Sequence, residues 1–283
     1  VSLHDLDAGR GFYGTLSPRG LLAQRFDLLR PSRLRALLRL DAGLRRLRGL
    51  FVDGRLHGAT LEEALERIPQ MTGLARRLFL CVLCLLSSME ADEVLAAPAA
   101  FFAGKLLAHP DVLSPRAFAS IRCVPGGTRR YVQALARAFG GRIVLGARIR
   151  TIRRDESGVD LVFHDGARRR FERLVLACNA DAALGLLEEP TERERELLGP
   201  WRYKEGRIVV HHDHAAFPPR PLQQAFTFLY TEREGRLVTA VNGCLRSLPG
   251  VRGSCDTIGS QHPNFPIRPD RVELETVLRT PIF

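Results

Sequence analysis

Apolar residues in the first 120 positions recur every three to four residues, which is the period of an α-helix. Thr60 and Glu63 have the spacing of a capping box, which predicts a helix that begins there and ends before Pro69. A further helix is expected between Pro98 and Pro110, because proline marks the limits of a helix. This part of the chain is therefore expected to be mainly helical.

The stretch 78–86, LFLCVLCLL, is apolar on every side and predicts a helix buried all round. It is shorter than the ~20 residues that a membrane-spanning helix needs. Cys81 and Cys84 within it would suit a zinc site only if a second pair were present, so core packing is favoured for both thiols. The apolar helices of 74–107 could line a hydrophobic substrate pocket, although plain core packing gives the same pattern.

The segment 31–51 has leucines at helical spacing and arginines on the opposite side. One interpretation is a helix that faces the core with its leucines and solvent with its arginines, and this is favoured. The other is a helix that lies on an anionic membrane surface. The apolar positions are Leu37, Leu40, Leu44, Leu47 and Phe51, and the basic positions are Arg35, Arg39, Arg45, Arg46 and Arg48.

After position 121 the pattern changes to short strands separated by glycine-containing turns. Thr128 is expected to cap a helix that Gly140 ends. An antiparallel meander follows in 142–173. LVLAC at 174–178 is apolar throughout, which is typical of a strand covered on both faces in a parallel sheet, and a helix is expected after it.

Three further strands are predicted beyond position 200, at 206–213, 224–231 and 236–243. The last two are joined through EREG and should pair as a hairpin. A loop rich in Gly, Ser and Pro is expected over 245–270, and another strand over 271–283.

Residues 9–14 read GRGFYG, which matches the Gly-x-Gly-x-x-Gly pattern of a dinucleotide cradle. The pattern binds a pyrophosphate only between a buried strand and a helix. His4, Asp5 and Asp7 precede it where an apolar strand is needed, and Pro18 follows where the helix should form. A glycine-rich turn between two short extended pieces is therefore expected.

The chain of 283 residues has a formal charge of +11, and Lys105 and Lys204 are its only lysines. The arginines are spread along the chain and aromatic residues make up only 7%, so a nucleic-acid partner is not expected. The six cysteines lack the regular spacing of a disulfide scaffold, which favours a reducing, cytoplasmic location.

His211, His212 and His214 surround Asp213. On a strand, His212 and His214 would share one face, which is a spacing that metal sites use. No third ligand is marked in the sequence, so no metal site is expected and strand residues beside the substrate cavity are favoured.

Several stretches together resemble the FAD-dependent amine-oxidase-like superfamily, especially its bacterial branch of NAD/FAD-binding oxidoreductases. They are RGLLAQRFDLLRPSRLRALL, VPGGTRRYVQALA, RIVLGARIRTIRR, FERLVLACNADAALGLLEEPTERERELLGPWRY and IRPDRVELETVLRTPIF. The resemblance implies an α/β fold with an α+β substrate region: an incomplete Rossmann-like FAD domain and a substrate domain of helices and antiparallel sheet. It also implies that the N-terminal cradle and a C-terminal flavin-binding stretch of the family lie outside these residues.

Four segments follow from the resemblance. We expect a helical part of the substrate domain in 1–120, an FAD-domain segment in 121–200, a β-hairpin part of the substrate domain in 201–268, and the start of a return to the FAD domain in 269–283.

The resemblance also implies FAD as cofactor and four contact residues. Ile149 corresponds to a residue whose backbone meets the adenine edge, and Ala177 to a small residue that lets the dinucleotide approach. Gly126 and Gly127 correspond to the turn that re-enters the FAD domain, where a structural role is equally expected. Catalytic residues stay unknown, because the flavin ring performs the redox chemistry and neither lysine aligns with the lysine that some amine oxidases place near it.

The resemblance implies an FAD-dependent oxidoreductase that oxidises a small or lipid-like organic substrate. Two alternatives remain: a noncatalytic binding protein that has lost flavin binding, and a peripheral membrane protein that docks through Arg35–Arg48. The oligomeric state is left open.

Overall fold

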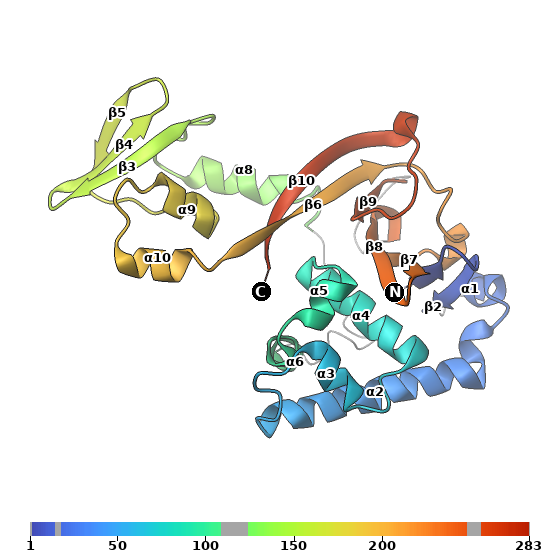
Figure 1. Ribbon diagram of the computed structural model, residues 1–283. Helices are drawn as coiled ribbons and strands as arrows, with labels where there is room; N and C mark the ends of the chain where they lie inside the picture. Colours follow the sequence, from blue (N-terminus) through green and yellow to red (C-terminus); the bar gives the residue numbers. More distant parts are fainter. Residues whose placement is uncertain (1, 15–17, 109–123, 248–255, 283) are drawn as a thin grey trace. The chain divides into compact units, whose positions relative to one another are not determined.

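In the computed structural model, residues 2–14, 18–108, 124–247 and 256–282 are described, and Figure 1 labels their elements. The chain divides into two compact units. The first, called unit 1, comprises Val1–Pro125 and Glu205–Thr280; the second, called unit 2, comprises Gly126–Lys204 and Pro281–Phe283.

Unit 1 is built on a seven-stranded mixed sheet with the order β10-β6-β9-β8-β7-β1-β2. Pairing is antiparallel for β1–β2, β6–β9, β7–β8 and β8–β9, and parallel for β1–β7. The strands are β1 (Ser2–Asp5), β2 (Arg10–Tyr13), β6 (Arg202–His211), β7 (Phe226–Arg233), β8 (Arg236–Cys244), β9 (Ile258–Gln261) and β10 (Val272–Ile282).

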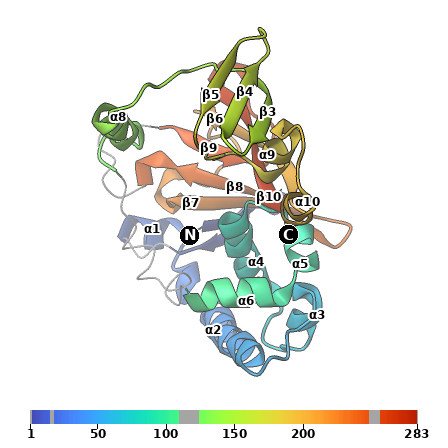
Figure 2. The same cartoon turned by 90° about the vertical axis from the view of Figure 1, so that its left-hand side faces the viewer.

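Helices gather on one face of this sheet (Figures 1 and 2), where α4 and α5 pack on β8 and α2 packs on α4 and α6. The described helices of unit 1 are α1 (Pro18–Ala23), α2 (Pro31–Val52), α3 (Leu61–Glu66), α4 (Gly73–Ser87), α5 (Ala91–Ala96) and α6 (Ala99–Ala108). Short 3-10 turns lie at η1 (Asp27–Leu29), η2 (Arg220–Leu222), η3 (Leu245–Ser247) and η4 (Pro269–Arg271). No helix in the described ranges is both long and apolar enough to cross a bilayer.

The helix α4 is buried from Leu78 to Cys84, because the sheet lies on one side of it and α2 and α5 lie on others, whereas Leu85 and Leu86 at the end of the apolar run are half-buried. Cys81 approaches Thr239 of β8, with 4.0 Å between the sulfur and the hydroxyl oxygen, and Cys84 is 1% exposed. The prediction of core packing for both thiols is confirmed.

The capping box of α3 forms as expected: the Glu63 amide donates to Thr60 Oγ1 at 3.3 Å and the Thr60 amide donates to Glu63 Oε2 at 2.9 Å. The helix ends at Glu66, before Pro69. The α6 helix begins directly after Pro98, and Pro110 lies outside the described residues.

In α2 the leucine stripe faces inward and the arginines face outward. Leu47 is 1% exposed, and Leu37, Leu40, Leu44 and Phe51 are half-buried. The core-facing interpretation of this stripe is confirmed, and the docking of this helix on a membrane stays a prediction.

The GRGFYG stretch forms the turn and second strand of the β1–β2 hairpin, as expected. Gly9 has a φ of +61°, and Gly11 lies so close to β1 that a Cβ there would be 1.9 Å from the Leu3 carbonyl oxygen. Both glycines therefore serve the hairpin. Gly14 is not helical and the next described helix, α1, begins only at Pro18, so the described residues place no helix start at the third glycine, where a dinucleotide cradle needs one.

The predicted hairpin of β7 and β8 is present, with Glu234 and Gly235 both at positive φ in its turn. The prediction of a loop over the whole of 245–270 is wrong in one place, because the strand β9 lies within this range. The sequence of β9, IGSQ, has a weak strand propensity, and its pairing with β6 and β8 on either side stabilises it.

Unit 2 contains the predicted antiparallel meander, ordered β3-β4-β5, and three helices. Figure 2 shows α8 well separated from this small sheet. Its elements are α8 (Arg129–Ala138), β3 (Ile149–Asp155), β4 (Gly158–Phe163), β5 (Arg168–Phe171), α9 (Ala180–Leu186) and α10 (Glu192–Leu198).

Candidate functional site

Gly126 and Gly127 form the turn that leads into α8, with φ values of +79° and +81°. Few residues other than glycine accept this conformation, so the turn accounts for both. A Cβ on Gly127 would meet no atom within 4 Å, which leaves open space beside the backbone. Thr128 occupies the N-cap position, but its side chain makes no capping hydrogen bond, so that part of the prediction is wrong.

Ile149 begins β3, opposite Phe163 of β4. Its half-buried side chain packs on the core cluster of Ile152, Leu161 and Leu187. The register shifts between Ile149 and Thr151, and such irregularities change the direction in which a strand presents its backbone.

The segment 174–178 pairs with no strand in the described part of the chain, which corrects the prediction of a strand covered on both faces. Leu174 and Leu176 pack on the same core cluster as Ile149, whereas Val175 is 87% exposed and Ala177 is also exposed. The meander covers one side of the segment and leaves the other bare.

The four residues expected to contact FAD therefore fall in two groups. Ile149 and the segment that contains Ala177 share one core, although Ala177 itself lies outside that core. Gly126 and Gly127 lie in the turn before α8, whose residues are all exposed. A small exposed Ala177 and the open space at Gly127 fit the close approach of a dinucleotide, and contact with FAD stays a prediction for all four.

A cavity of about 550 Å³ lies in unit 2 between the meander, 174–178 and the helices α9 and α10. Tyr203 closes one part of it, since its hydroxyl oxygen accepts a 2.7 Å hydrogen bond from the Ala180 amide. Arg154 binds Glu194 through both guanidinium nitrogens, and this hydrogen bonding lowers the pKa of Glu194 to about 2. The remaining lining is mostly apolar: Ile152, Val159, Leu174, Leu176, Cys178, Ala183, Leu187, Leu198 and Trp201.

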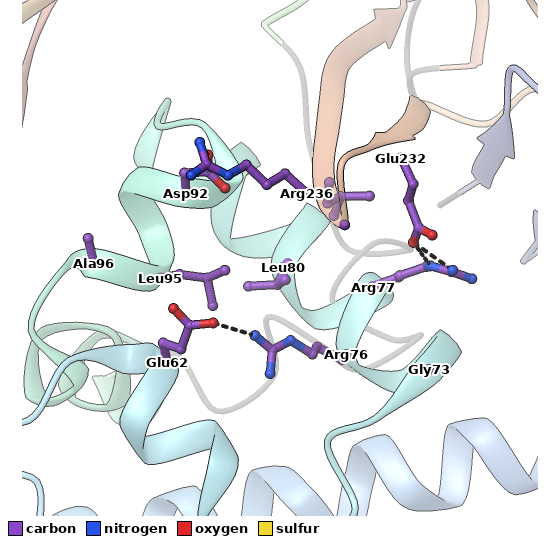
Figure 3. A pocket seen from close by; sticks show the side chains of 12 residues that line it. Glu62, Gly73, Arg76, Arg77, Leu80, Asp92, Leu95, Ala96, Glu232 and Arg236 are labelled. Atoms are coloured by element: carbon purple, nitrogen blue, oxygen red, sulfur yellow. Dashed lines mark hydrogen bonds and ion pairs between the residues drawn. The ribbon is translucent and has the colours of Figure 1, made fainter.

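Unit 1 holds a second cavity of about 560 Å³, shown in Figure 3, between α3, α4, α5 and the tip of the β7–β8 hairpin. Three arginine–carboxylate pairs surround it. Their nitrogen–oxygen distances are 3.3 Å for Arg76–Glu62, 2.6 Å for Arg77–Glu232 and 3.5 Å for Arg236–Asp92.

Each of these ion pairs joins two different elements. The cavity therefore lies between the helices and the hairpin and is lined by paired charges. Its lining residues include no thiol, hydroxyl or imidazole, and its apolar part is formed by Leu80, Leu95, Ala96 and Leu237. The expectation that helices 74–107 line a hydrophobic pocket therefore does not describe this cavity. The pairs were not predicted from the sequence, because each joins residues distant along the chain.

A buried polar chain crosses the other face of the sheet in unit 1. The Asp213 amide donates to His211 Nδ1 at 3.1 Å, so Nε2 carries the proton and donates to Ser260 Oγ at 2.7 Å. Ser260 donates to Asn242 Oδ1 at 2.6 Å, and the Asn242 amide donates to the Thr227 carbonyl oxygen at 2.8 Å. Burial lowers the pKa of His211, so the imidazole is neutral.

The histidine cluster around Asp213 does not form a metal site in the described ranges, where no three metal-binding side chains converge. The strand β6 ends at His211, so His212 and His214 do not share a strand face as predicted. His212 pairs with Glu273 at 3.2 Å, and His214 Nε2 lies 3.0 Å from the Asp256 carbonyl oxygen.

The contacts of Lys105 and Lys204 do not assign either lysine as a catalytic base. Lys105 donates to the Leu86 carbonyl oxygen at 3.2 Å and lies over the Phe101 ring, which ties α6 to the end of α4. Lys204 is half-buried at the end of unit 2.

Comparison with known proteins gives the family. The model of a family described as flavin-containing amine oxidoreductase matches residues 13–207, which is more than half of the chain. No curated protein matches the sequence.

Solved structures share the fold at low sequence identity. A fatty acid isomerase from P. acnes that produces CLA has a TM-score of 0.57 at 14% identity, over 98% of this chain and 66% of its own. Two redesigned putrescine oxidases, a triple and a double mutant, have TM-scores of 0.52 and 0.51 at 14% and 15% identity; each match covers 92% of this chain and 56% of theirs. This chain thus spans less than two thirds of each.

These findings confirm the resemblance to the amine-oxidase-like superfamily and the expected cofactor, and they agree with a mixed α/β fold that has one large mixed sheet and one small antiparallel sheet. The chain belongs to the flavin-containing amine oxidoreductases, whose cofactor is FAD.

Proposed function

We propose that the protein works as an FAD-dependent oxidoreductase that oxidises a small or lipid-like organic substrate. The observation that carries this proposal is the family match over residues 13–207, which takes in segments of both units. One of the structurally similar proteins acts on a fatty acid and two on putrescine, so an acyl chain and an amine are the substrate classes to test first.

Unit 2 is proposed to supply the adenine side of the FAD domain. Large apolar side chains are exposed over it: Tyr131 49%, Leu135 66%, Phe139 59%, Leu145 89% and Val175 87%. Exposed apolar side chains that cluster on one element, as Tyr131, Leu135 and Phe139 do on α8 and its C-cap, normally mark a surface that binds another protein segment. We propose that further segments of the flavin domain pack there and place the dinucleotide beside Gly127 and Ala177.

Unit 1 is proposed to supply the substrate region. When bound, the flavin accepts the hydride or electrons that leave the substrate. The residues of unit 1 then have three tasks: to orient the substrate, to exclude water and to hold the sheet rigid. The chain of hydrogen bonds from His211 to Asn242 supports the third task, because each of its members is satisfied inside the core.

The experiment is anaerobic reduction of the bound flavin, carried out on the protein encoded by the longest reading frame that contains these residues. Fatty acids of increasing length and aliphatic amines are added in turn, and the visible flavin absorbance is recorded. We expect one class to bleach the flavin with saturation kinetics. A protein that retains FAD but is bleached by dithionite alone would contradict a role in oxidising either class.

A noncatalytic role is the second candidate, and the hairpin at GRGFYG is the observation that favours it. Gly9 lies in the turn and Gly11 in the strand pairing of that hairpin, so this stretch does not form a pyrophosphate cradle. This candidate predicts that the longest reading frame yields a protein without flavin even when FAD is added during purification.

A further inference from the structure

We propose that the segment 18–48 of unit 1 docks on the surface of an anionic lipid membrane. This inference is independent of the proposed redox function, because it rests on a surface of unit 1 and not on FAD. It concerns a different set of side chains from the inward leucine stripe of α2.

The first observation is a run of large apolar side chains that point away from the core. They lie on α1, on η1 and its flanks, and on the first turns of α2, which packs against η1. Their exposed fractions are 69% for Leu22, 51% for Phe26, 52% for Leu29, 45% for Leu34 and 70% for Leu38. Exposed apolar residues that are clustered in this way mark an interaction surface, whereas single ones do not.

The second observation is the charge of the same segment. Residues 18–48 contain nine arginines, two aspartates and no other charged side chain, so they carry seven of the chain's eleven excess positive charges. Asp27 is bound by Arg30 and Arg33, and Asp41 is bound by Arg45, so both acidic groups are already neutralised. Arg35 and Arg39 are exposed beside Leu34 and Leu38 on α2.

The third observation is the backbone that presents Phe26. Arg25 and Phe26 have φ values of +49° and +57°, a conformation that costs energy for residues other than glycine. The Phe26 amide donates to the Leu21 carbonyl oxygen at 2.8 Å, and the Arg25 amide donates to the Leu22 carbonyl oxygen at 2.9 Å, which holds the turn. A strained turn is thus maintained while its aromatic side chain stays in solvent.

Together these features fit a lipid surface better than a nucleic acid. Leucine and phenylalanine gain free energy when they enter the acyl boundary, and arginine gains free energy beside anionic headgroups. A nucleic-acid surface would reward the arginines alone and would leave the five apolar side chains in water.

The test is co-sedimentation of the purified protein with vesicles of phosphatidylcholine, with or without phosphatidylglycerol. We expect binding to the vesicles that contain phosphatidylglycerol, and a weakening of that binding at high salt. The double variant Leu22→Glu/Leu38→Glu should bind about tenfold more weakly, because it removes insertion and adds negative charge. Both positions are exposed, so the fold of unit 1 should be retained.

Two variants serve as controls. Leu145→Glu removes an exposed apolar side chain of unit 2, and Arg193→Glu reverses an exposed charge on α10. Both should bind vesicles as the wild type does. Equal binding by all variants, loss of binding in Leu145→Glu alone, or binding to duplex DNA but to neither vesicle would overturn the proposal.

Discussion

Gly11 lies directly against the backbone of β1. This close contact, and not the binding of a cofactor, explains why glycine is needed at this position. An added Cβ would lie 1.9 Å from the Leu3 carbonyl oxygen. We expect Gly11→Ala to lower the free energy of unfolding by about 2 kcal/mol, because the hairpin must open to admit the methyl group. Chemical denaturation followed by circular dichroism measures the change.

Gly49 of α2 is the matched control, because an added Cβ there meets no atom within 4 Å. Gly49→Ala should raise the free energy of unfolding by about 0.5–1 kcal/mol, through the better helix propensity of alanine. If Gly11→Ala proved as harmless as Gly49→Ala, the close approach of β1 and β2 would be wrong.

His211 makes the stability of the protein depend on pH. Burial lowers its pKa in the folded state, so the unfolded chain binds the proton more readily. Stability is therefore complete above the ordinary histidine pKa of about 6.5 and falls as the pH drops below it, by at most about 1.4 kcal/mol per pH unit for one group. Urea unfolding at several pH values between neutral and mildly acidic measures this loss.

The variant His211→Gln should lose less stability on acidification than the wild type. His4, whose pKa burial also lowers, accounts for part of the remaining dependence. The exposed His164 is the control position, and His164→Gln should keep the wild-type dependence. An identical acid loss in all three proteins would show that the imidazole of His211 is not buried in its neutral form.

Thiol reactivity should separate the four described free cysteines. Burial raises the pKa of Cys81 to about 12 and that of Cys244 to about 11, whereas Cys178 is exposed. We expect iodoacetamide to label Cys178 first and to leave Cys81, Cys84 and Cys244 unmodified until the protein unfolds. Peptide mass spectrometry after a short exposure reads the order, and early labelling of Cys81 would contradict the packing of α4.

At the scale of elements, α3 and α8 differ in how they begin. Thr60 caps α3 with its side chain, and Thr128 at the start of α8 does not. Thr60→Ala should therefore lower the free energy of unfolding by about 1 kcal/mol, and Thr128→Ala should change it by less than about 0.5 kcal/mol. Thermal unfolding of both variants tests this difference, and equal losses would contradict it.

Elements whose signal is local could be predicted from the sequence. The capping box, the β7–β8 hairpin and the meander each depend on residues within a few positions of one another. The strand β9 was missed, because its stability comes from two neighbours that are distant in sequence. The sequence LVLAC at 174–178 predicts a strand buried on both faces. In the structure the side of this segment that carries Val175 is exposed.

The candidate site was predictable only in part, for the same reason. The family resemblance located the turn at Gly126 and the segment that contains Ala177, since both are sequence motifs. The ion pairs around the cavity of unit 1 and the buried chain from His211 to Asn242 depend on tertiary contacts. Their member residues carry no local signal that distinguishes them from other charged or polar side chains.

At the scale of the whole molecule, FAD affinity should depend on the size of residue 177. Ala177→Trp would fill the space into which the dinucleotide is proposed to fit, so we expect FAD to bind at least about tenfold more weakly. The exposed Ala182 on α9 is the control, and Ala182→Trp should bind FAD as the wild type does. Titration of the apoprotein with FAD, followed by flavin fluorescence, measures both affinities, and equal affinities would remove Ala177 from the site.

The most direct measurement is the amount of FAD bound per chain in the protein encoded by the longest reading frame that contains these residues. The account predicts a yellow protein with close to one FAD per chain, released on denaturation. A folded protein that stays colourless after incubation with FAD would contradict the assignment of unit 2 to a flavin-binding domain.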